Sequence, residues 1–130
     1  MKFAYAIIYV QDVKSSLAFM GQAFGLATKF YHESDYGELV TGETSLAFAQ
    51  HELAGSNLPG GYVAADQSPK PLGMEIGLVS DNVQADYDRA IAAGAKSIQP
   101  PKTKPWGQVV AYVRCPDGLL VEICSPVAGG

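Results

Sequence analysis

Hydrophobic residues follow two different spacings near the start of the chain. Residues 3–10 form an apolar run of strand length that ends just before Gln11 and Asp12. A helical spacing follows, in which the apolar residues are Val13, Leu17, Met20 and Phe24. Asp12 is a residue type that caps helix N-termini, and Gly25 is one that ends helices. This stretch therefore predicts a strand followed by a helix.

Three shorter strands are expected after this helix, because runs of apolar and β-branched residues alternate with glycine-containing turns. These runs cover residues 27–33, 37–41 and 44–51. Residues 1–51 thus predict a first module with the order β-α-β-β-β. Residues 52–72 carry four clusters of glycine or proline. A stretch of that composition is unusual inside a compact domain and predicts a linker or a flap.

The same order of elements restarts after the linker, over residues 73–126. A strand is expected at 74–79, and Asp81 is expected to cap a helix that runs to Ala93 and ends at Gly94. The apolar stripe of this helix consists of Val83, Tyr87, Ala90 and Ile91. Three more strands are predicted at 96–100, 109–114 and 119–124, the last two joined by a Cys-Pro-Asp-Gly turn.

Matching positions in the two halves indicate an internal duplication. Val10-Gln-Asp12 and Val79-Ser-Asp81 lie 69 residues apart, and so do Gly25 and Gly94. Two such modules within residues 1–130 predict a single α+β domain, in which tandem β-α-β-β-β units form curved mixed sheets. Open sheet edges on a small, apolar-rich chain favour pairing with a second copy, so a homodimer is expected.

Composition narrows the class of partner. A chain of 130 residues with 48% hydrophobic residues is enough for one domain with its own core. The net charge is −4 and no run of Lys or Arg is present, which argues against nucleic acid as a partner. The apolar runs are too short to cross a bilayer, and the N-terminus lacks a signal-peptide pattern. Cys115 and Cys124 are too few for a disulfide framework. A cytoplasmic protein with no membrane partner is expected.

Glu122 is the residue that most needs an explanation. It lies in the middle of the otherwise apolar strand 119–124, where an unpaired carboxylate is costly to bury. Glu122 is therefore expected to face water, a cleft or a metal ion. In a pocket it could act as a hydrogen-bond acceptor or as a general base whose pKa is raised by burial. The alternative is an exposed or salt-bridged carboxylate, with Arg114 on the neighbouring strand as its partner.

Three stretches resemble the vicinal oxygen chelate superfamily, which includes glyoxalase I, bleomycin-resistance proteins, fosfomycin-modifying enzymes and extradiol dioxygenases. They are residues 9–19, residues 74–81, and Pro105-Trp-Gly107 followed by Pro116-Asp-Gly-Leu-Leu-Val-Glu122. The resemblance implies that each module curls into a cup with its helix on the convex side. It also implies that two modules, often from two subunits, close around each ligand.

In metal-dependent members of this superfamily, the resemblance implies one metal ligand on each of four strands. These positions fall on Tyr5, near Ala47, on Glu75 and on Glu122. The two glutamates are ligand types that such sites use, so at most half of a metal site is expected. A site without a cofactor is the main expectation. A divalent ion (Ni, Zn, Mn, Mg or Fe) at Glu75 and Glu122 is the alternative.

Several other side chains are expected to line the cup. Trp106 lies where bleomycin-resistance proteins commonly have a Trp-Gly pair, and an indole there can stack on a flat ligand. Alternatively, Trp106 packs at an interface. Tyr5 is likewise either a ligand contact or an aromatic residue of the core. His51 alternates with the alanines of its strand and is either a solvated strand end or a site residue. The expected ligand contacts are Tyr5, Ala47, Ala49, Glu75, Trp106, Gln108, Tyr112, Arg114 and Glu122.

Two functions remain open at this point. The first is a metal-free protein of the bleomycin-resistance type, which sequesters an amphipathic or aromatic ligand at a dimer interface, as in antibiotic resistance, and is not an enzyme. The second is a metal-dependent lyase or isomerase of the glyoxalase I type that uses Glu122 and Glu75. Ring-cleaving dioxygenase chemistry has the least support. Its iron site resembles two histidines and one glutamate, and no pair of histidines occupies those positions.

Overall fold

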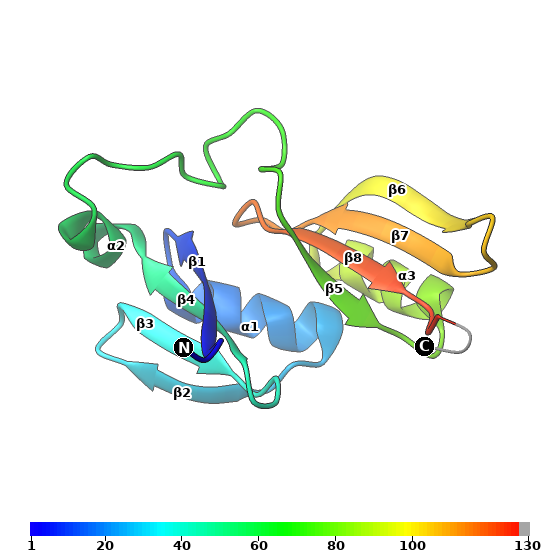
Figure 1. Cartoon of the computed structure of the whole chain (residues 1–130), viewed down its shortest axis with the longest axis horizontal. Helices are drawn as coiled ribbons and strands as arrows, with labels where there is room; N and C mark the ends of the chain where they lie inside the picture. Colours follow the sequence, from blue (N-terminus) through cyan, green and yellow to red (C-terminus); the bar gives the residue numbers. More distant parts are fainter. Residues whose placement is uncertain (128–130) are drawn as a thin grey trace.

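Two four-stranded sheets lie side by side in the computed structural model, which describes residues 1–127, and helices α1 and α3 cover the same side of the pair (Figure 1). The strand order is β1-β4-β3-β2 in the first sheet and β5-β8-β7-β6 in the second. One pair of neighbours in each sheet is parallel and the others are antiparallel. The predicted α+β fold with two β-α-β-β-β units is confirmed. The elements are β1 (Tyr5–Val10), α1 (Val13–Phe24), β2 (Thr28–His32), β3 (Tyr36–Leu39), β4 (Ser45–Gln50), α2 (His51–Asn57), β5 (Glu75–Val79), α3 (Val83–Ala93), β6 (Lys96–Thr103), β7 (Val109–Arg114) and β8 (Leu120–Cys124).

Helix α1 begins and ends where the sequence predicts. The Asp12 side chain accepts a hydrogen bond from the backbone N–H of Ser15 at 3.2 Å. Gly25 ends the helix in the left-handed conformation (φ 70°), which glycine adopts without steric cost. The predicted apolar stripe faces the core: Val13, Leu17 and Met20 are buried, and Phe24 packs beside them.

Helix α3 is capped one residue later than predicted. Asn82, not Asp81, accepts the hydrogen bond from the backbone N–H of Ala85, at 3.1 Å. Both residue types are good N-caps, so the sequence offered two neighbouring candidates. The two caps, Asp12 and Asn82, lie 70 residues apart, so the repeat spacing at the caps is 70 rather than the expected 69.

Two strand boundaries also differ from the prediction. Strand β4 ends at Gln50, and His51 begins the short helix α2, which the hydrophobic pattern did not predict. Strand β6 continues past its expected end at Pro100 as far as Thr103. It lies at the edge of its sheet, and its register with β7 shifts on both sides of Gln99. An irregular edge strand of this kind tolerates proline, since it needs fewer ladder hydrogen bonds.

The irregular segment between α2 and β5 is anchored to the second sheet. Nη2 of Arg114 donates to the carbonyl oxygens of Ala65, at 2.7 Å, and Ser68, at 3.0 Å. Gly118 makes this close approach possible, because a Cβ at that position would overlap the Ala65 carbonyl group. Residues 52–72 therefore contain most of helix α2 and a stretch of backbone that is fixed by specific contacts.

One hydrophobic core lies between the helices and the sheets and is continuous through both halves. Helix α3 packs beside α1, and Arg89 donates to the carbonyl oxygens of Gln22 and Gly21 in the last turn of α1. This packing covers one face of each sheet and leaves the other without a helix (Figure 1). Within residues 1–127, no helix combines the length and the apolar character that a membrane span requires.

Candidate functional site

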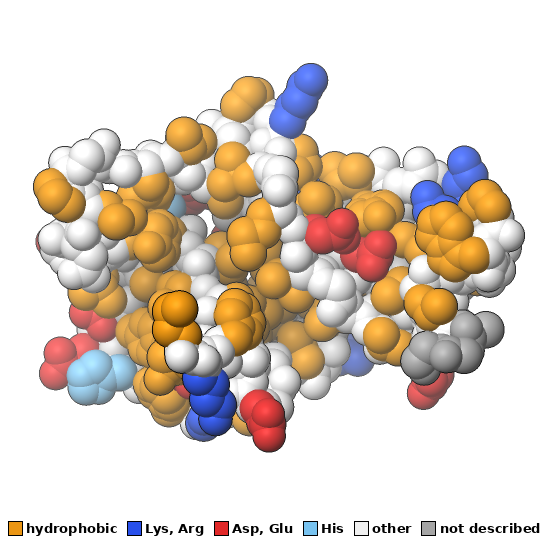
Figure 2. Space-filling model, in the orientation of Figure 1, with side chains coloured by type: hydrophobic (Ala, Val, Ile, Leu, Met, Phe, Trp, Pro, Cys, Tyr) orange, Lys and Arg blue, Asp and Glu red, His pale blue; other side chains and the backbone are white. Residues whose placement is uncertain are grey.

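Each sheet has one face without a helix, which we call its open face. Successive residues of a strand point to opposite faces, so alternate side chains reach the open face. Figure 2 looks onto both open faces and shows hydrophobic side chains over both sheets, with acidic side chains over β5 and β8. The open face includes Tyr5, Ile7 and Tyr9 from β1 and Glu75, Gly77 and Val79 from β5. Large apolar groups are left uncovered here: Tyr5 is 57% exposed and Val79 70%.

A row of four residues in register crosses the open face of the second sheet, in the order Gly77, Glu122, Tyr112 and Gln99. The hydroxyl group of Tyr112 donates to Glu122 Oε1 at 2.9 Å. Gly77 has no side chain, and a Cβ there would lie 3.6 Å from Glu122 Oε2. Tyr112 therefore fixes one carboxylate oxygen, while the glycine leaves the space beside the other oxygen open.

Glu122 also changes the acidity of the groups around it. Burial raises the pKa of Glu75, and the nearby Glu122 charge raises this pKa further. The hydrogen bond to Glu122, followed by burial, raises the pKa of Tyr112 to about 12. Burial, followed by the Glu122 charge, raises the pKa of Cys124. A ligand on this face would meet one carboxyl group with raised proton affinity beside one hydrogen-bonded carboxylate.

The corresponding row on the first sheet carries its carboxylate on a different strand. Its members in register are Ile7, Ala47, Glu38 and Phe30. Ala47 is fully buried and has no donor atom in its side chain. Glu38, its neighbour on β3, is 5% exposed and accepts a hydrogen bond from the Tyr36 hydroxyl at 2.8 Å. Sequence reasoning missed Glu38, although the criterion used for Glu122, a lone carboxylate inside a predicted strand, would have found it.

Trp106 and Gln108 precede strand β7 rather than continuing it. Trp106 lies in the turn between β6 and β7 and is 63% exposed, and its Nε1 donates to Gln108 Oε1 at 2.9 Å. The Nε2 of Gln108 donates in turn to the Ser125 carbonyl oxygen at 2.9 Å. Trp106 does not follow the alternation of β7, because Gly107 (φ 91°) turns the backbone between Trp106 and Gln108. The indole is held by its nitrogen, and its ring faces stay largely exposed.

Arg114 reaches the open face by its register position, but its side chain contacts the linker. The Nη2 of Arg114 donates to the Ala65 and Ser68 carbonyl oxygens. Glu122, for which Arg114 was an alternative partner, is instead hydrogen-bonded to Tyr112. The guanidinium group therefore orders the linker, and Tyr112 performs the role of holding Glu122.

His51 does not share the open face with Ala47 and Ala49, which corrects the sequence-based expectation. The strand ends at Gln50, so His51 leaves the alternation and starts α2. Its Nδ1 lies 2.6 Å from the Tyr62 hydroxyl oxygen, and its Nε2 lies 3.2 Å from Asp66 Oδ2. Both ring nitrogens are thus engaged by the linker.

The four family positions for metal ligands do not fit a metal site within one chain. Ala47 offers no donor, and Tyr5 offers an exposed phenol, which leaves the two carboxylates Glu75 and Glu122. No group of three or more His, Cys, Asp or Glu side chains among residues 1–127 is placed to hold a metal ion. Sites for Zn and similar ions use three or four protein donors. We derive no chemistry through a metal from this donor set.

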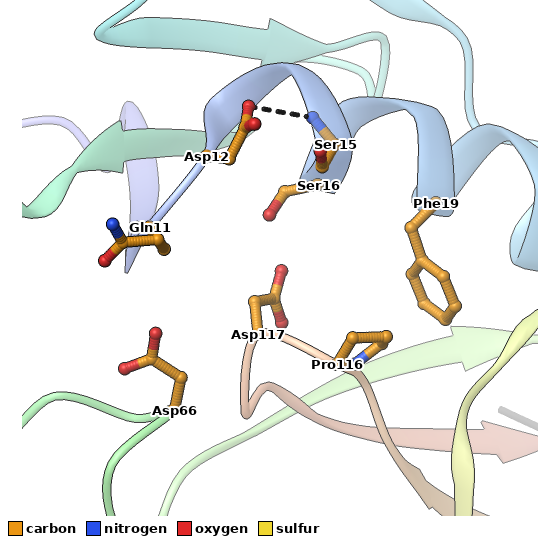
Figure 3. A pocket seen from close by; sticks show the side chains of 8 residues that line it. All are labelled: Gln11, Asp12, Ser15, Ser16, Phe19, Asp66, Pro116 and Asp117. Carbon is orange, nitrogen blue, oxygen red and sulfur yellow. Dashed lines mark hydrogen bonds between the residues drawn. The ribbon is translucent and has the colours of Figure 1, made fainter.

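A separate cavity of about 340 Å³ lies at the ends of the strands, between the start of α1, the linker and the β7–β8 turn (Figure 3). Asp117 points toward Ser16 across this cavity, and Asp66 approaches from the linker. Burial raises the pKa of Asp117, although hydrogen bonds from the Leu119 backbone and from Ser16 oppose that shift. Within the described residues, Asp66 Oδ1 is buried without a hydrogen-bond partner. These carboxylates belong to the junction between the two halves rather than to an open face.

Comparison with known families agrees with this architecture. The profile of the glyoxalase-like domain matches residues 3–128, which is nearly the whole chain. The chain belongs to the glyoxalase-like family. Its membership in the vicinal oxygen chelate superfamily, which the three stretches of sequence predicted, is thereby confirmed. No curated protein matches this glyoxalase-like chain.

Solved structures with the same fold cover almost all of this glyoxalase-like chain. It is similar to a glyoxalase-related enzyme from Fulvimarina pelagi, with 23% identity and a TM-score of 0.82 over 97% of this chain and 88% of that one. It is also similar to a glyoxalase/bleomycin resistance protein/dioxygenase family enzyme from Burkholderia phytofirmans, with 22% identity and a TM-score of 0.81 over 96% and 98% of the two chains. TioX from Micromonospora sp. has 19% identity and a TM-score of 0.67 over 96% and 98%. At these identities the similarity establishes the fold alone.

Proposed function

We propose that this glyoxalase-like protein binds a small amphipathic or aromatic molecule on its open sheet faces and sequesters it without a metal ion. One observation carries the proposal: both open faces present exposed aromatic and aliphatic side chains around carboxylates that tyrosines hold in place. Tyr36 holds Glu38 and Tyr112 holds Glu122. Mostly apolar surfaces with a few oriented polar groups are typical of small-molecule sites.

The expected ligand contacts divide into two groups on this proposal. Trp106, 63% exposed, and Tyr5, 57% exposed, offer ring faces for stacking. Glu122 and Glu75 offer polar anchoring, one as an acceptor and one as a carboxyl group with a raised pKa. Ala47 and Ala49, which were also expected to contact the ligand, are 0% and 5% exposed, so neighbouring side chains cover them in the free chain.

A second copy of the chain is the proposed cover for these faces. The two sheets lie side by side in one chain, so their open faces point the same way and do not close on each other (Figures 1 and 2). Exposed apolar groups on the first sheet (Ile7, 42%) and the second (Val79, 70%) favour burial against another surface. A two-fold dimer would place each open face against its counterpart and enclose the ligand.

The alternative, a metal-dependent lyase or isomerase of the glyoxalase I type, receives less support. Two of its four ligand positions hold Tyr5 and Ala47. Two acids remain, Glu75 and Glu122. Of these, Glu122 stays a candidate general base only for a ligand that brings a proton to its Oε2, the oxygen that Tyr112 does not bind. Elemental analysis of protein purified without chelator separates the two functions. A stoichiometric transition metal that is lost in Glu122→Ala would favour the lyase and contradict our proposal.

The binding proposal is tested with 2-naphthol, a neutral amphipathic aromatic probe. We expect the probe to raise the Tm of the wild-type protein, and we expect Trp106→Ala to abolish most of that shift while Trp106→Phe retains part of it. Val63→Ala is the matched control, since Val63 is 69% exposed but belongs to the linker. Equal shifts in wild type and Trp106→Ala would exclude stacking on Trp106. Sedimentation equilibrium tests the dimer, and a monomer at micromolar concentration would overturn that part of the proposal.

A further inference from the structure

A second cavity, of about 260 Å³, lies where the linker meets the second sheet, at the start of β6 and the end of β7. Lys96 in its lining is exposed and Arg114 is partly exposed, so solutes can reach both side chains from the solvent. The lining also includes Asp66 and Ser68 from the linker, together with Gly94 and Gly118.

The two basic side chains of this cavity occupy directly opposite positions on neighbouring strands. Lys96 of β6 pairs with Arg114 of β7 in the antiparallel register. Side chains at opposite positions have Cβ atoms about 5 Å apart, and two like charges there are destabilising. No ion pair among residues 1–127 includes either cation. A bound anion would therefore replace one repulsion with two attractions.

Arg114 keeps hydrogen-bond donors that the fold does not use. Its Nη2 donates to the Ala65 and Ser68 carbonyl oxygens and lies 3.2 Å from Ser68 Oγ. Within residues 1–127, every hydrogen bond of this side chain leaves from Nη2, so Nε and Nη1 have donors to spare. The linker thus holds the guanidinium group in one orientation. A group held in this way loses little further conformational entropy when it binds a ligand.

Two negative features of the lining oppose an anion, and neither neutralises the basic pair. Asp66 directs its oxygens elsewhere, because Oδ1 is buried and Oδ2 lies 3.2 Å from His51 Nε2. Helix α3 ends at Gly94, and the C-terminus of a helix carries a partial negative charge. Two cations against one carboxylate and one helix end leave the cavity with a positive balance.

A phosphate group matches the donors of this cavity better than a carboxylate group does. Arg114 offers Nε and Nη1, and Lys96 adds its ammonium group, so the donors belong to three nitrogen atoms. A phosphate group presents three strong acceptor oxygens and a charge of about −1.5 to −2 at neutral pH. A carboxylate presents two oxygens and a single charge. Organic cations and metal ions would be repelled by both side chains.

We infer that this cavity binds a phosphate group between Lys96 and Arg114, and that the bound phosphate stabilises the linker. The second part follows because Arg114 would hold the phosphate and the linker backbone at the same time. A ligand that binds only the ordered linker disfavours its local opening. The inference goes beyond the proposed function and does not depend on ligand binding at the open faces.

The test is a titration of the full chain with inorganic phosphate, at constant pH and ionic strength, followed by amide NMR shifts. We expect saturable binding to the wild type, and Lys96→Gln should weaken it about tenfold by removing one charge-assisted hydrogen bond. Lys102→Gln is the matched control, because Lys102 is an exposed lysine of the same strand that pairs with Val110. It should bind phosphate as the wild type does.

Hydrogen exchange at the Gln67 amide, which donates to the Ala64 carbonyl oxygen, reports on the linker. Phosphate should slow this exchange in the wild type and in Lys102→Gln, but not in Lys96→Gln at the same concentration. Exchange that phosphate leaves unchanged in the wild type, despite saturable binding, would overturn the effect on the linker.

Lys96→Arg provides a second variant in case Lys96→Gln does not fold, and it should retain most of the phosphate affinity because it keeps the charge. Phenyl phosphate distinguishes the source of the phosphate group. Binding of both probes indicates a phosphate monoester as the ligand, and binding of inorganic phosphate alone indicates the free ion. Absence of saturable binding for both probes would overturn the inference. Equal losses of affinity in Lys96→Gln and Lys102→Gln would also overturn it, since they would show diffuse attraction by surface charge.

Discussion

Tyr112 donates a 2.9 Å hydrogen bond to Glu122 from the directly opposite position on the neighbouring strand. The first sheet has a similar pair, in which Tyr36 donates to Glu38 at 2.8 Å, but there both residues lie on β3. The two halves of the duplication thus each hold one carboxylate on the open face with a phenol. The two halves differ in the strand that carries the carboxylate, which is β8 in the second sheet and β3 in the first. The neighbours of the carboxylate therefore differ between the two open faces.

The charge on Glu122 should be measurable through Glu75. Glu122→Gln removes the second cause of the raised pKa of Glu75 and leaves burial, the larger cause, in place. We therefore expect the pKa of Glu75 to fall, yet to stay above its ordinary value. Side-chain carboxyl NMR over a pH titration measures this shift. Glu52→Gln, at an exposed position in α2, is the control, and a Glu75 pKa that is unchanged in Glu122→Gln would contradict the coupling.

Gly118→Ala should destabilise the fold by about 2–4 kcal/mol, because a methyl group would collide with the Ala65 backbone and because φ is 93° there. Gly61→Ala is the matched control. Gly61 has a similar positive φ of 76° but nothing within 4 Å of its added Cβ. Gly61→Ala should therefore lower the free energy of unfolding by about 1 kcal/mol, from backbone strain alone. Urea unfolding of both variants separates the collision from the backbone strain, and equal costs would show that the linker can move away.

Asp117→Asn should change how stability depends on pH. Burial raises the pKa of Asp117 in the folded state above its unfolded value of 3.8, so the protonated form favours folding. The associated stability is present below that unfolded pKa and is lost as the pH rises through the folded pKa. The difference in unfolding free energy between Asp117→Asn and the wild type should thus shift in favour of the variant as the pH rises from 3 to 7. Chemical denaturation at both pH values measures the gain. Asp81→Asn, at an exposed position, is the control. An unfolding free energy that differs between Asp117→Asn and the wild type by the same amount at both pH values would contradict the prediction.

Arg114 should control the order of the linker. Arg114→Met removes donors to the Ala65 and Ser68 carbonyl oxygens, so we expect faster hydrogen exchange at the Gln67 amide, which bonds to Ala64. Arg89→Met is a matched control, because Arg89 also donates to backbone carbonyls, but at the end of α1. It should speed exchange near Gly25 and spare Gln67. Protection of Gln67 in Arg114→Met equal to wild type would show that other contacts hold the linker.

The sequence determined the features that depend on neighbouring residues. Hydrophobic spacing identified α1 and α3, and Asp12 and Gly25 marked the ends of α1 because caps act within one helical turn. Alternation along the strands, together with the duplication, identified the two β-α-β-β-β units and the isolated carboxylate Glu122. These signals lie within short windows, so the chain order alone reveals them.

Tertiary structure decided which side chains meet. The pairing of Glu38 with Ala47 depends on the register between β3 and β4, and a shift by one residue would turn Glu38 to the other face. The use of Arg114 by the linker depends on a contact 49 residues away in sequence, between Arg114 and Ala65. His51 left its expected face because the strand ended one residue earlier than its pattern predicted. Residues far apart along the chain become neighbours only when the strands pair into sheets. Sequence spacing therefore could not predict which side chains meet on the open faces.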